Sequence, residues 1–253
     1  MLPPLRNPRR TIGDRSFDFS QRVAVMAIVN RTPDSFYDAG ANYALEDAVA
    51  SALRAVRDGA DWIDIGGVPF APGEPLSVDE ECDRVVPVVH ALRSQSDVVI
   101  SVDTFHADVA RRSIAAGATV INDTTGLSDP NLARVVADSE ASLVLVHSRA
   151  QPRTQFARPQ YDDVAVEVRD FLASRVELAH NAGVPDDRLF VDPGHDLNKN
   201  TLHSLELTRR LDLITELGLP TLVALSNKDF IGEVLDKPKR ERLEGSLASA
   251  VAC

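Results

Sequence analysis

The segment "VVISVD" (residues 98–103) is followed by a helical pattern over residues 106–116 and then by "TVINDT" (119–124). Both apolar runs are short and rich in Val and Ile, which is typical of strands buried on both faces of a parallel sheet. The first run ends in Asp103, and the second contains Asn122 and Asp123 near its end. A strand–helix–strand unit of this kind indicates an α/β fold.

The same unit repeats along the chain and gives seven strand–helix units in strict alternation. This pattern leaves two architectures, a doubly wound sheet and a (β/α)8 barrel. No GxGxxG follows the first strand, and nearly every strand ends in a polar residue, so a barrel would gather these residues on one face. We therefore predict a TIM (β/α)8 barrel whose eighth strand–helix unit is not present in this sequence. The other strands are expected over residues 23–30, 61–66, 142–147, 188–193 and 221–226, and the other helices over 44–58, 78–94, 130–138, 162–182, 201–217 and 239–252.

Composition limits the class of protein. The chain has 253 residues, 44% of them hydrophobic, and no Pro/Ser-rich linker, so we predict one barrel domain over residues 21–253. Residues 1–20 are rich in arginine and are expected to be a flexible basic arm. The net charge of −11 argues against a nucleic-acid groove or an anionic membrane surface, and no apolar run is long enough for a membrane span. Cys82 and Cys253 fit no metal or redox spacing, so a reducing cytoplasm is expected.

The polar strand ends have ordinary interpretations when they are taken singly. An Asp or Asn that closes a strand often caps the next helix, and a lone His147 is more often a structural residue than a base. Taken together, acceptors and donors that converge in a barrel mouth suit a flat heteroaromatic ligand with many hydrogen-bonding edges. Five such positions are Asn30, Asp103, Asn122, Asp192 and Lys228.

Several segments resemble the dihydropteroate synthase family. "AIVNRTPDSFYDAG" (27–40) is similar to its first signature, which usually reads Asn-Val-Thr-Pro-Asp-Ser-Phe. Five later segments match in order and spacing, and the resemblance runs from about Val23 to the end of the chain. These segments are "SVDTF" (101–105), "INDTTG" (121–126), "PQYDDVAVEV" (159–168), "VDPG" (191–194) and "SNKDFIG" (226–232).

The resemblance implies a place in folate biosynthesis. Members of the family condense a dihydropterin methyl pyrophosphate with para-aminobenzoate, and the pyrophosphate leaves with assistance from Mg²⁺. Sulfonamides mimic the aminobenzoate. The family is usually dimeric through its late helices, so the resemblance also implies a homodimer. The small-molecule partner that it implies is of the pterin type.

The resemblance also implies roles for individual residues. Asp103, Asn122, Asp192 and Lys228 would form the pterin pocket together with Ser226, and Lys228 and Asp103 would be the catalytic candidates. These residue types suit the task, because a carboxylate can accept two parallel N–H bonds and an amide can both donate and accept. A lysine can donate to the pterin carbonyl and offset developing negative charge. Asn30 would lie near the pyrophosphate and the metal.

Four departures from the family pattern are visible. The loop that usually reads Gly-Gly-Glu-Ser-(Thr/Ser)-Arg-Pro-Gly here reads "GGVPFAPG" (66–73), so that Phe70 and Ala71 replace the Thr/Ser and the Arg. Asn227 stands where the family usually has an Arg, and "DPGHDLNKN" (192–200) replaces a glycine-rich segment. The Arg-x-His motif of the eighth strand has no match in this sequence.

These departures predict a weak or inactive synthase with a largely retained pterin pocket. A hydrogen bond to a charged group contributes about 1.5–3 kcal/mol, so loss of the arginine at position 71 would weaken pyrophosphate binding roughly 10- to 150-fold. Three alternatives remain open: an active synthase in which Arg31 replaces the lost arginine, a pterin-dependent methyltransferase, and a non-catalytic protein that binds pterin or sulfa drugs.

Overall fold

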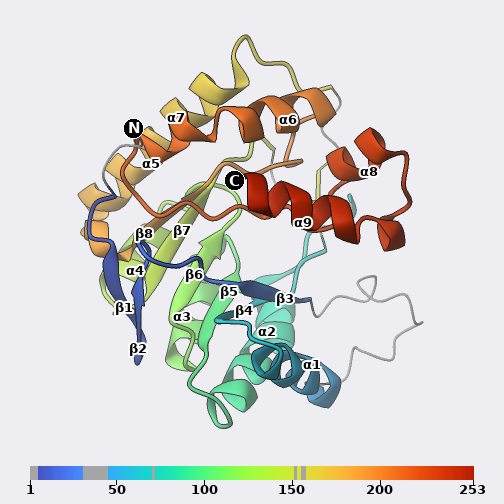
Figure 1. The fold of residues 1–253 in the computed structure, drawn as a ribbon. Coiled ribbons are helices and arrows are strands. Elements are labelled where there is room, and N and C mark those ends of the chain that lie inside the picture. The colour runs from blue at the N-terminus through green and yellow to red at the C-terminus, as the bar shows by residue number, and fades with distance from the viewer. Residues whose placement is uncertain (1–4, 31–44, 70–71, 151–152, 155–157) are drawn as a thin grey trace.

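The computed structural model describes residues 5–30, 45–69, 72–150, 153–154 and 158–253. Six parallel strands form its large sheet, and their spatial order is their order along the chain (Figure 1). A doubly wound sheet would instead reverse its order at a switch point. The sequential order therefore agrees with the predicted barrel type, in which successive units wind in one direction. The strands are β3 (Met26–Asn30), β4 (Trp62–Gly66), β5 (Val99–Asp103), β6 (Val120–Asp123), β7 (Ser142–Val146) and β8 (Leu189–Asp192).

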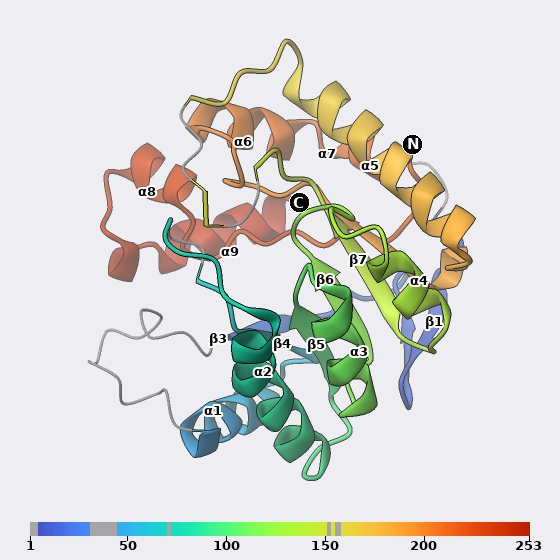
Figure 2. The same cartoon turned by 180° about the vertical axis from the view of Figure 1, so that it is seen from behind.

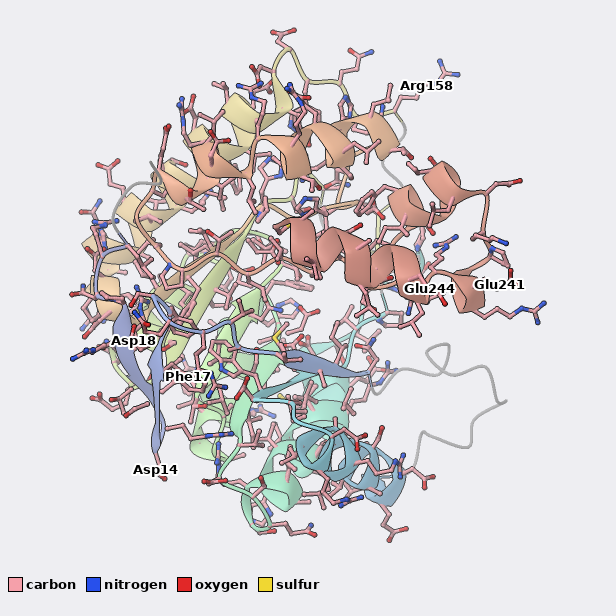
Figure 3. All side chains as sticks on the ribbon, viewed as in Figure 1. Asp14, Phe17, Asp18, Arg158, Glu241 and Glu244 are labelled. Atoms are coloured by element: carbon pink, nitrogen blue, oxygen red, sulfur yellow. The ribbon has the colours of Figure 1, made fainter. Side chains whose placement is uncertain are left out.

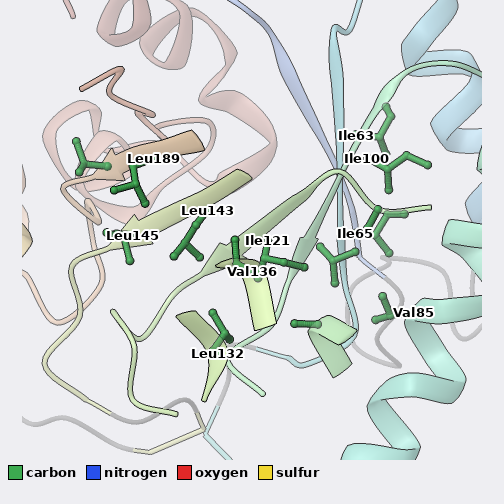
Figure 4. Close-up of a cluster of buried hydrophobic side chains, with 14 of the residues drawn as sticks. Ile63, Ile65, Val85, Ile100, Ile121, Leu132, Val136, Leu143, Leu145 and Leu189 are labelled. Atoms are coloured by element: carbon green, nitrogen blue, oxygen red, sulfur yellow. The ribbon is translucent and has the colours of Figure 1, made fainter. Parts of the chain in front are cut away.

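Helices follow the strands and pack around the outside of the sheet (Figures 1 and 2). The core between them is aliphatic: Ile63, Ile65 and Ile100 of the strands lie in the same buried cluster as Val85 of a covering helix (Figure 4). No helix in the described ranges is long and apolar enough to span a membrane. The helices are α1 (Leu45–Arg57), α2 (Val78–Arg93), α3 (Ala107–Ala115), α4 (Leu132–Ala137), α5 (Val164–Ala182), α6 (Thr201–Arg209), α7 (Leu211–Thr215), α8 (Asp229–Leu235) and α9 (Leu243–Ala252).

Local sequence sets the ends of two of these helices. Helix α2 begins with a capping box, in which the Ser77 hydroxyl accepts from the Glu80 N–H and the Glu80 carboxylate accepts from the Ser77 N–H. The N-cap of helix α5 is Asp163, whose side chain accepts hydrogen bonds from two backbone N–H groups. The helix ends at Gly183, whose φ of +103° lies in the left-handed region that favours glycine.

The prediction of a flexible arm over residues 1–20 is wrong for residues 9–18. These residues form an antiparallel hairpin of β1 (Arg9–Ile12) and β2 (Arg15–Asp18). Ile12 and Phe17, with 2% and 5% of their surface exposed, pack in a cluster with Trp62 and Phe190 near the amino ends of the large sheet's strands. Figure 3 shows Phe17 on this hairpin, with Asp14 at its turn.

The arginine content of residues 1–20 suggested a solvent-exposed segment, but one of these arginines, Arg10, is buried. Arg10 donates from Nη1 to the carbonyl of Leu189 at 2.6 Å, and its guanidinium lies 4.8 Å from the centre of the Phe190 ring. Burial lowers the pKa of Arg10 to about 10. Arginines in this segment therefore attach the hairpin to the sheet, a role that composition cannot distinguish from a solvated basic arm.

The predicted seventh strand at 221–226 is also wrong. Only Thr221 forms a bridge, to Val191 of β8, and the Leu222 N–H donates to the Val191 carbonyl at 2.8 Å. Pro220 has no N–H to donate, and within the described residues no strand pairs with this segment on its other side. Two helix predictions change as well, because the range 201–217 divides into α6 and α7 at Arg210 and α8 was not predicted.

Candidate functional site

Polar side chains form a row across the carboxyl ends of neighbouring strands. The sheet register pairs Asn30 with Gly66, Gly66 with Asp103, and Asp103 with Asn122. A Cβ atom at Gly66 would lie 2.8 Å from Oδ1 of Asn30 and 3.8 Å from Oδ2 of Asp103. The glycine therefore leaves room for the side chains of Asn30 and Asp103 on either side of it, which a larger residue would crowd.

A hydrogen-bond network lies beside this row. Asp64, 4% exposed, accepts from the Ser101 hydroxyl through Oδ1 and from Nδ2 of Asn122 through Oδ2, the second bond at 3.3 Å. Oδ1 of Asn122 is buried and has no hydrogen-bond partner among the described residues. Asp64 is not among the sequence-predicted site residues; the signal that could have found it is an acidic residue within the otherwise apolar strand β4.

Asp192, the predicted residue of β8, is buried beside two lysines. Its Oδ1 accepts from the Gly194 N–H at 2.6 Å. Burial raises the pKa of Asp192, and the charges of Lys228 and Lys199 oppose that shift. The carboxylate can therefore stay ionised in a buried place while one of its oxygens remains available to a ligand.

Lys228 precedes α8, in the turn that also contains the predicted residues Ser226 and Asn227. Its ammonium group donates to the carbonyl of His195. Burial lowers the pKa of Lys228, and the charge of Asp192 is the main opposing influence. Ser226 and Asn227 are exposed, so the turn brings only its lysine into the buried polar group.

Arg242 holds this turn in place. It precedes α9, and its Nη1 donates to the carbonyls of Asn227 and Lys228 at 3.0 and 3.2 Å and to the carboxylate of Asp229 at 2.9 Å. A guanidinium with several donors in a fixed plane suits such convergent acceptors. Arg242 is not among the sequence-predicted site residues, because nothing in the local sequence pattern shows that a residue fourteen positions later reaches back to Lys228.

The acids of the site share one buried region. Burial raises the pKa of Asp103 well above its usual range, and the neighbouring charges of Asp64 and Glu81 add to the shift. Glu81 of α2 is fully buried, and burial raises its pKa to about 7. Its Oε2 lies 4.0 Å from Nε2 of His106. A raised pKa allows a carboxyl group to hold a proton, which is what acid–base chemistry on a ligand requires.

His147 pairs with a buried lysine. Nζ of Lys199 donates to Nδ1 of His147 at 2.8 Å and to the carbonyls of Gly194 and Leu197. Burial, with a further contribution from the Lys199 charge, lowers the pKa of His147 to about 2, so the ring is neutral and accepts. The structural interpretation of His147 is therefore confirmed by its hydrogen bonds.

The "HDLN" segment (195–198) is attached by hydrogen bonds to the chain that follows β7. Asp196 and Asn198 have φ values of +63° and +52°, which lie in the left-handed region. Glycine adopts this region without strain, and the family usually has a glycine-rich segment at these positions. Oδ1 of Asn198 accepts from the N–H groups of Arg149 and Ala150 and from the Ser148 hydroxyl, at 2.7–2.9 Å. The strained backbone at Asn198 is thus accompanied by three hydrogen bonds to the chain that follows β7.

The loop after β4 contributes no charge where it is described. Val68 and Pro69 are partly buried, whereas Phe70 and Ala71 lie outside the described residues. Both ends of the loop are attached to neighbours. Arg84 donates to the carbonyl of Gly67 at 3.0 Å, and the Gly73 N–H donates to the carbonyl of Arg153 at 3.0 Å.

A Mg²⁺ site can be tested against the residues present. Over the described ranges no group of three or more His, Cys, Asp or Glu side chains is placed to hold a metal. Mg²⁺ is commonly bound by one or two protein oxygens together with substrate phosphates and water. The amide oxygen of Asn30, beside Asp103, fits such a partial site but not a complete protein cage.

Comparison with known proteins agrees with this arrangement. Residues 26–253 match the family described as pterin binding enzyme. The chain is 48% identical over 236 residues to inactive dihydropteroate synthase 2 of Mycobacterium leprae (strain TN), which covers 91% of this chain and 81% of that protein. It is 41% identical over 228 residues to dihydropteroate synthase of Escherichia coli (strain K12), covering 90% and 81%.

A solved structure gives the same result in three dimensions. Dihydropteroate synthase of Xanthomonas albilineans with 4-aminobenzoic acid matches with a TM-score of 0.89 and 40% identity, over 97% of this chain and 88% of that chain. The matched regions include every strand end described above. The chain therefore belongs to the pterin-binding enzyme family, as a homologue of dihydropteroate synthase.

Proposed function

We propose that this chain binds a pterin in its barrel mouth and catalyses dihydropteroate synthesis weakly or not at all. One contrast carries the proposal. The polar residues at the ends of β5, β6 and β8 are assembled, with Lys228 beside Asp192. The neighbouring loop after β4 has Val68, Pro69, Phe70 and Ala71 in place of polar and basic residues.

The assembled residues can recognise a pterin through complementary edges. A free oxygen of Asp192 can accept N–H bonds from the aminopyrimidine, and Oδ1 of Asn122 can accept another. The Lys228 ammonium can donate to the ring carbonyl. In a synthase reaction Lys228 would offset negative charge that develops on the ring, and Asp103, whose pKa is raised by burial, could hold a proton. Asp103 and Lys228 are the catalytic residues of this proposal.

The expected loss of catalysis follows from the missing positive charges around the leaving group. The leaving group is an anion, and neither Ala71 nor Asn227 carries a positive charge to hold it. Asn30 offers one neutral oxygen to Mg²⁺, which when bound would neutralise the pyrophosphate. Loss of one arginine alone weakens pyrophosphate binding roughly 10- to 150-fold, so departure of the pyrophosphate would be slow.

One observation favours a second candidate, an active synthase, although Arg31, the substitute for the lost arginine that the sequence suggests, lies outside the described residues. The Arg153 guanidinium packs against Gly73 at the end of the loop, although its Nε donates to the carbonyl of Glu74. A cation therefore lies close to the altered loop and could attract the pyrophosphate. The two candidates differ in how strongly the phosphorylated ligand binds.

Calorimetric titration distinguishes them. The protein is titrated with 6-hydroxymethyl-7,8-dihydropterin pyrophosphate and Mg²⁺, and separately with the unphosphorylated pterin. Equal affinities for the two ligands are expected, together with weak or no turnover when 4-aminobenzoate is added. Micromolar binding of the pyrophosphate form that is much tighter than that of the free pterin would favour the active synthase.

A homodimer is the assembly that we propose. Small residues of α9 face the protein: Gly245 packs against Leu235 and Ile231 of α8, and Ser246 is buried. The other side of α9 exposes apolar residues, with Leu247 58% and Val251 89% exposed. An exposed apolar stripe of this kind is typical of an interface. Sedimentation of the protein at several concentrations tests whether it is dimeric.

A further inference from the structure

Two side chains support the residue that would read the edge of the ligand. Asp64 of β4 and Ser101 of β5 are direct partners in the sheet register, and both are buried. The Ser101 hydroxyl donates to Oδ1 of Asp64. This bond leaves Oδ2 as the free acceptor of the carboxylate, and Oδ2 accepts from Nδ2 of Asn122.

The orientation of the Asn122 amide follows from this contact. An ionised carboxylate only accepts hydrogen bonds, so the amide must turn its NH₂ group toward Asp64. Its oxygen is then left as an acceptor, and Oδ1 is buried without a partner in the described part of the chain. A buried acceptor without a partner is unfavourable, and a ligand N–H would remove that cost.

We propose that Asp64 is a positioning residue for Asn122: by holding Nδ2 it fixes Oδ1 as an acceptor, so that this position selects an N–H donor on the edge of a heteroaromatic ring. The inference rests on the proposed pterin function, which supplies a ring with such donors. Asp64 acts through Asn122 and needs no contact with the ligand.

The charge of Asp64 is the property that matters. Burial raises its pKa, while the hydrogen bonds from Ser101 and Asn122 oppose the shift and favour the ionised form. An asparagine at position 64 has the same size but can donate as well as accept. The two amides could then pair in either direction, and Oδ1 of Asn122 would no longer be fixed toward the ligand.

A double-mutant cycle tests this role. Binding of 6-hydroxymethyl-7,8-dihydropterin is measured by calorimetry for the unchanged protein, Asp64→Asn, Asn122→Ala and the double variant, with thermal unfolding of each as a check of folding. Asp64→Asn is expected to weaken binding about tenfold in the unchanged background and to have little effect, within about twofold, when Asn122 is already Ala.

Two further variants sharpen the test. The exchange Asp64→Asn with Asn122→Asp restores a hydrogen bond in the reverse direction and keeps an acceptor at position 122, so affinity should recover to within about threefold. Ser101→Ala keeps the Asp64 carboxylate but removes the hydrogen bond that it accepts from the Ser101 hydroxyl. We expect this variant to weaken pterin binding less than Asp64→Asn does, again through the orientation of Asn122.

The outcomes separate this inference from the proposed function. If the unchanged protein binds no pterin, the proposed function fails, and this inference fails with it. If the unchanged protein binds pterin but Asp64→Asn weakens binding equally with and without Asn122, the carboxylate acts by its charge or by supporting the fold, and only the positioning role is overturned. Failure of the exchange to recover affinity would also count against that role.

Discussion

The floor of the barrel mouth and the loop after β4 are adjacent in the fold but differ in chemistry. The floor consists of the carboxyl and amide groups at the strand ends and the Lys228 ammonium group from the turn before α8, held by neighbours such as Ser101 and Arg242. The loop keeps its glycines at positions 66, 67 and 73, but the side chains between them are uncharged. The two parts would bind different parts of one substrate, because the floor suits a flat ring and the loop would have held an anion.

This difference shows how a binding site can lose one part and keep another. The carboxyl and amide residues of the floor belong to the sheet, so their replacement also disturbs buried hydrogen bonds and packing. Loop side chains that point toward a ligand carry no such structural load. An arginine such as the one expected at position 71 could therefore be lost at little cost to the fold.

The largest effect is expected at the floor. Asp192→Asn keeps an oxygen for the Gly194 N–H but removes the charge that faces Lys228 and would accept the pterin N–H groups. Loss of two charge-assisted bonds of about 1.5–3 kcal/mol each predicts at least about 100-fold weaker pterin binding. Calorimetry measures the affinity for the pterin, and Asp212→Asn, at an exposed aspartate, is the matched control. A loss below about threefold would mean that the floor does not bind the ring.

The next effect concerns pH and the base of the loop. Glu81 packs near Gly67, and its pKa of about 7 in the folded protein exceeds the ordinary value of 4.5. The folded state therefore binds the proton more tightly, so the free energy of unfolding should fall by about 3 kcal/mol as pH rises from 4.5 to 7. Glu81→Gln should remove this decrease, whereas exposed Glu177→Gln should not. Denaturant unfolding at several pH values measures it, and an unchanged slope in Glu81→Gln would contradict the assignment.

A gain is expected when the loop receives its missing charge. Ala71→Arg should tighten binding of the pterin pyrophosphate with Mg²⁺ by roughly 10- to 150-fold, and leave binding of the unphosphorylated pterin unchanged. Ala71→Gln, similar in length but neutral, is the control. If both ligands respond equally, or if the glutamine variant matches the arginine variant, the loop is not the part that lost the anion site.

The smallest effect is expected at the segment that borders the floor. Asn198→Gly removes three hydrogen bonds but relieves a left-handed φ, so we expect a net loss of about 1 kcal/mol in the free energy of unfolding. Asn227→Gly is the control, because Asn227 has a similar φ and an exposed side chain, and it should be neutral or slightly stabilising. Denaturant unfolding compares the two; equal effects would mean that the Asn198 side chain holds nothing.

Much of the fold could be predicted because its signals are local. Strands β3 to β8 and most helices follow from apolar runs and amphipathic periods. The segment at 221–226 has the same composition as the true strands, yet it lacks a full set of hydrogen-bonding neighbours. The hairpin at 9–18 was missed for the opposite reason, since its arginines suggested solvent while Ile12 and Phe17 are buried.

The fold class, the family and the residues at the strand ends follow from the amino-acid sequence, because strand period, motif order and loop composition are all local along the chain. The absence of charge at position 71 is likewise visible in the sequence. Three contacts emerge only from the folded chain: Asn122 donates to Asp64, Arg242 donates to the Lys228 carbonyl, and His147 accepts from Lys199. These contacts join residues that are 14 to 58 positions apart, and nothing short of the folded sheet and its packed loops brings their donors and acceptors within hydrogen-bonding distance.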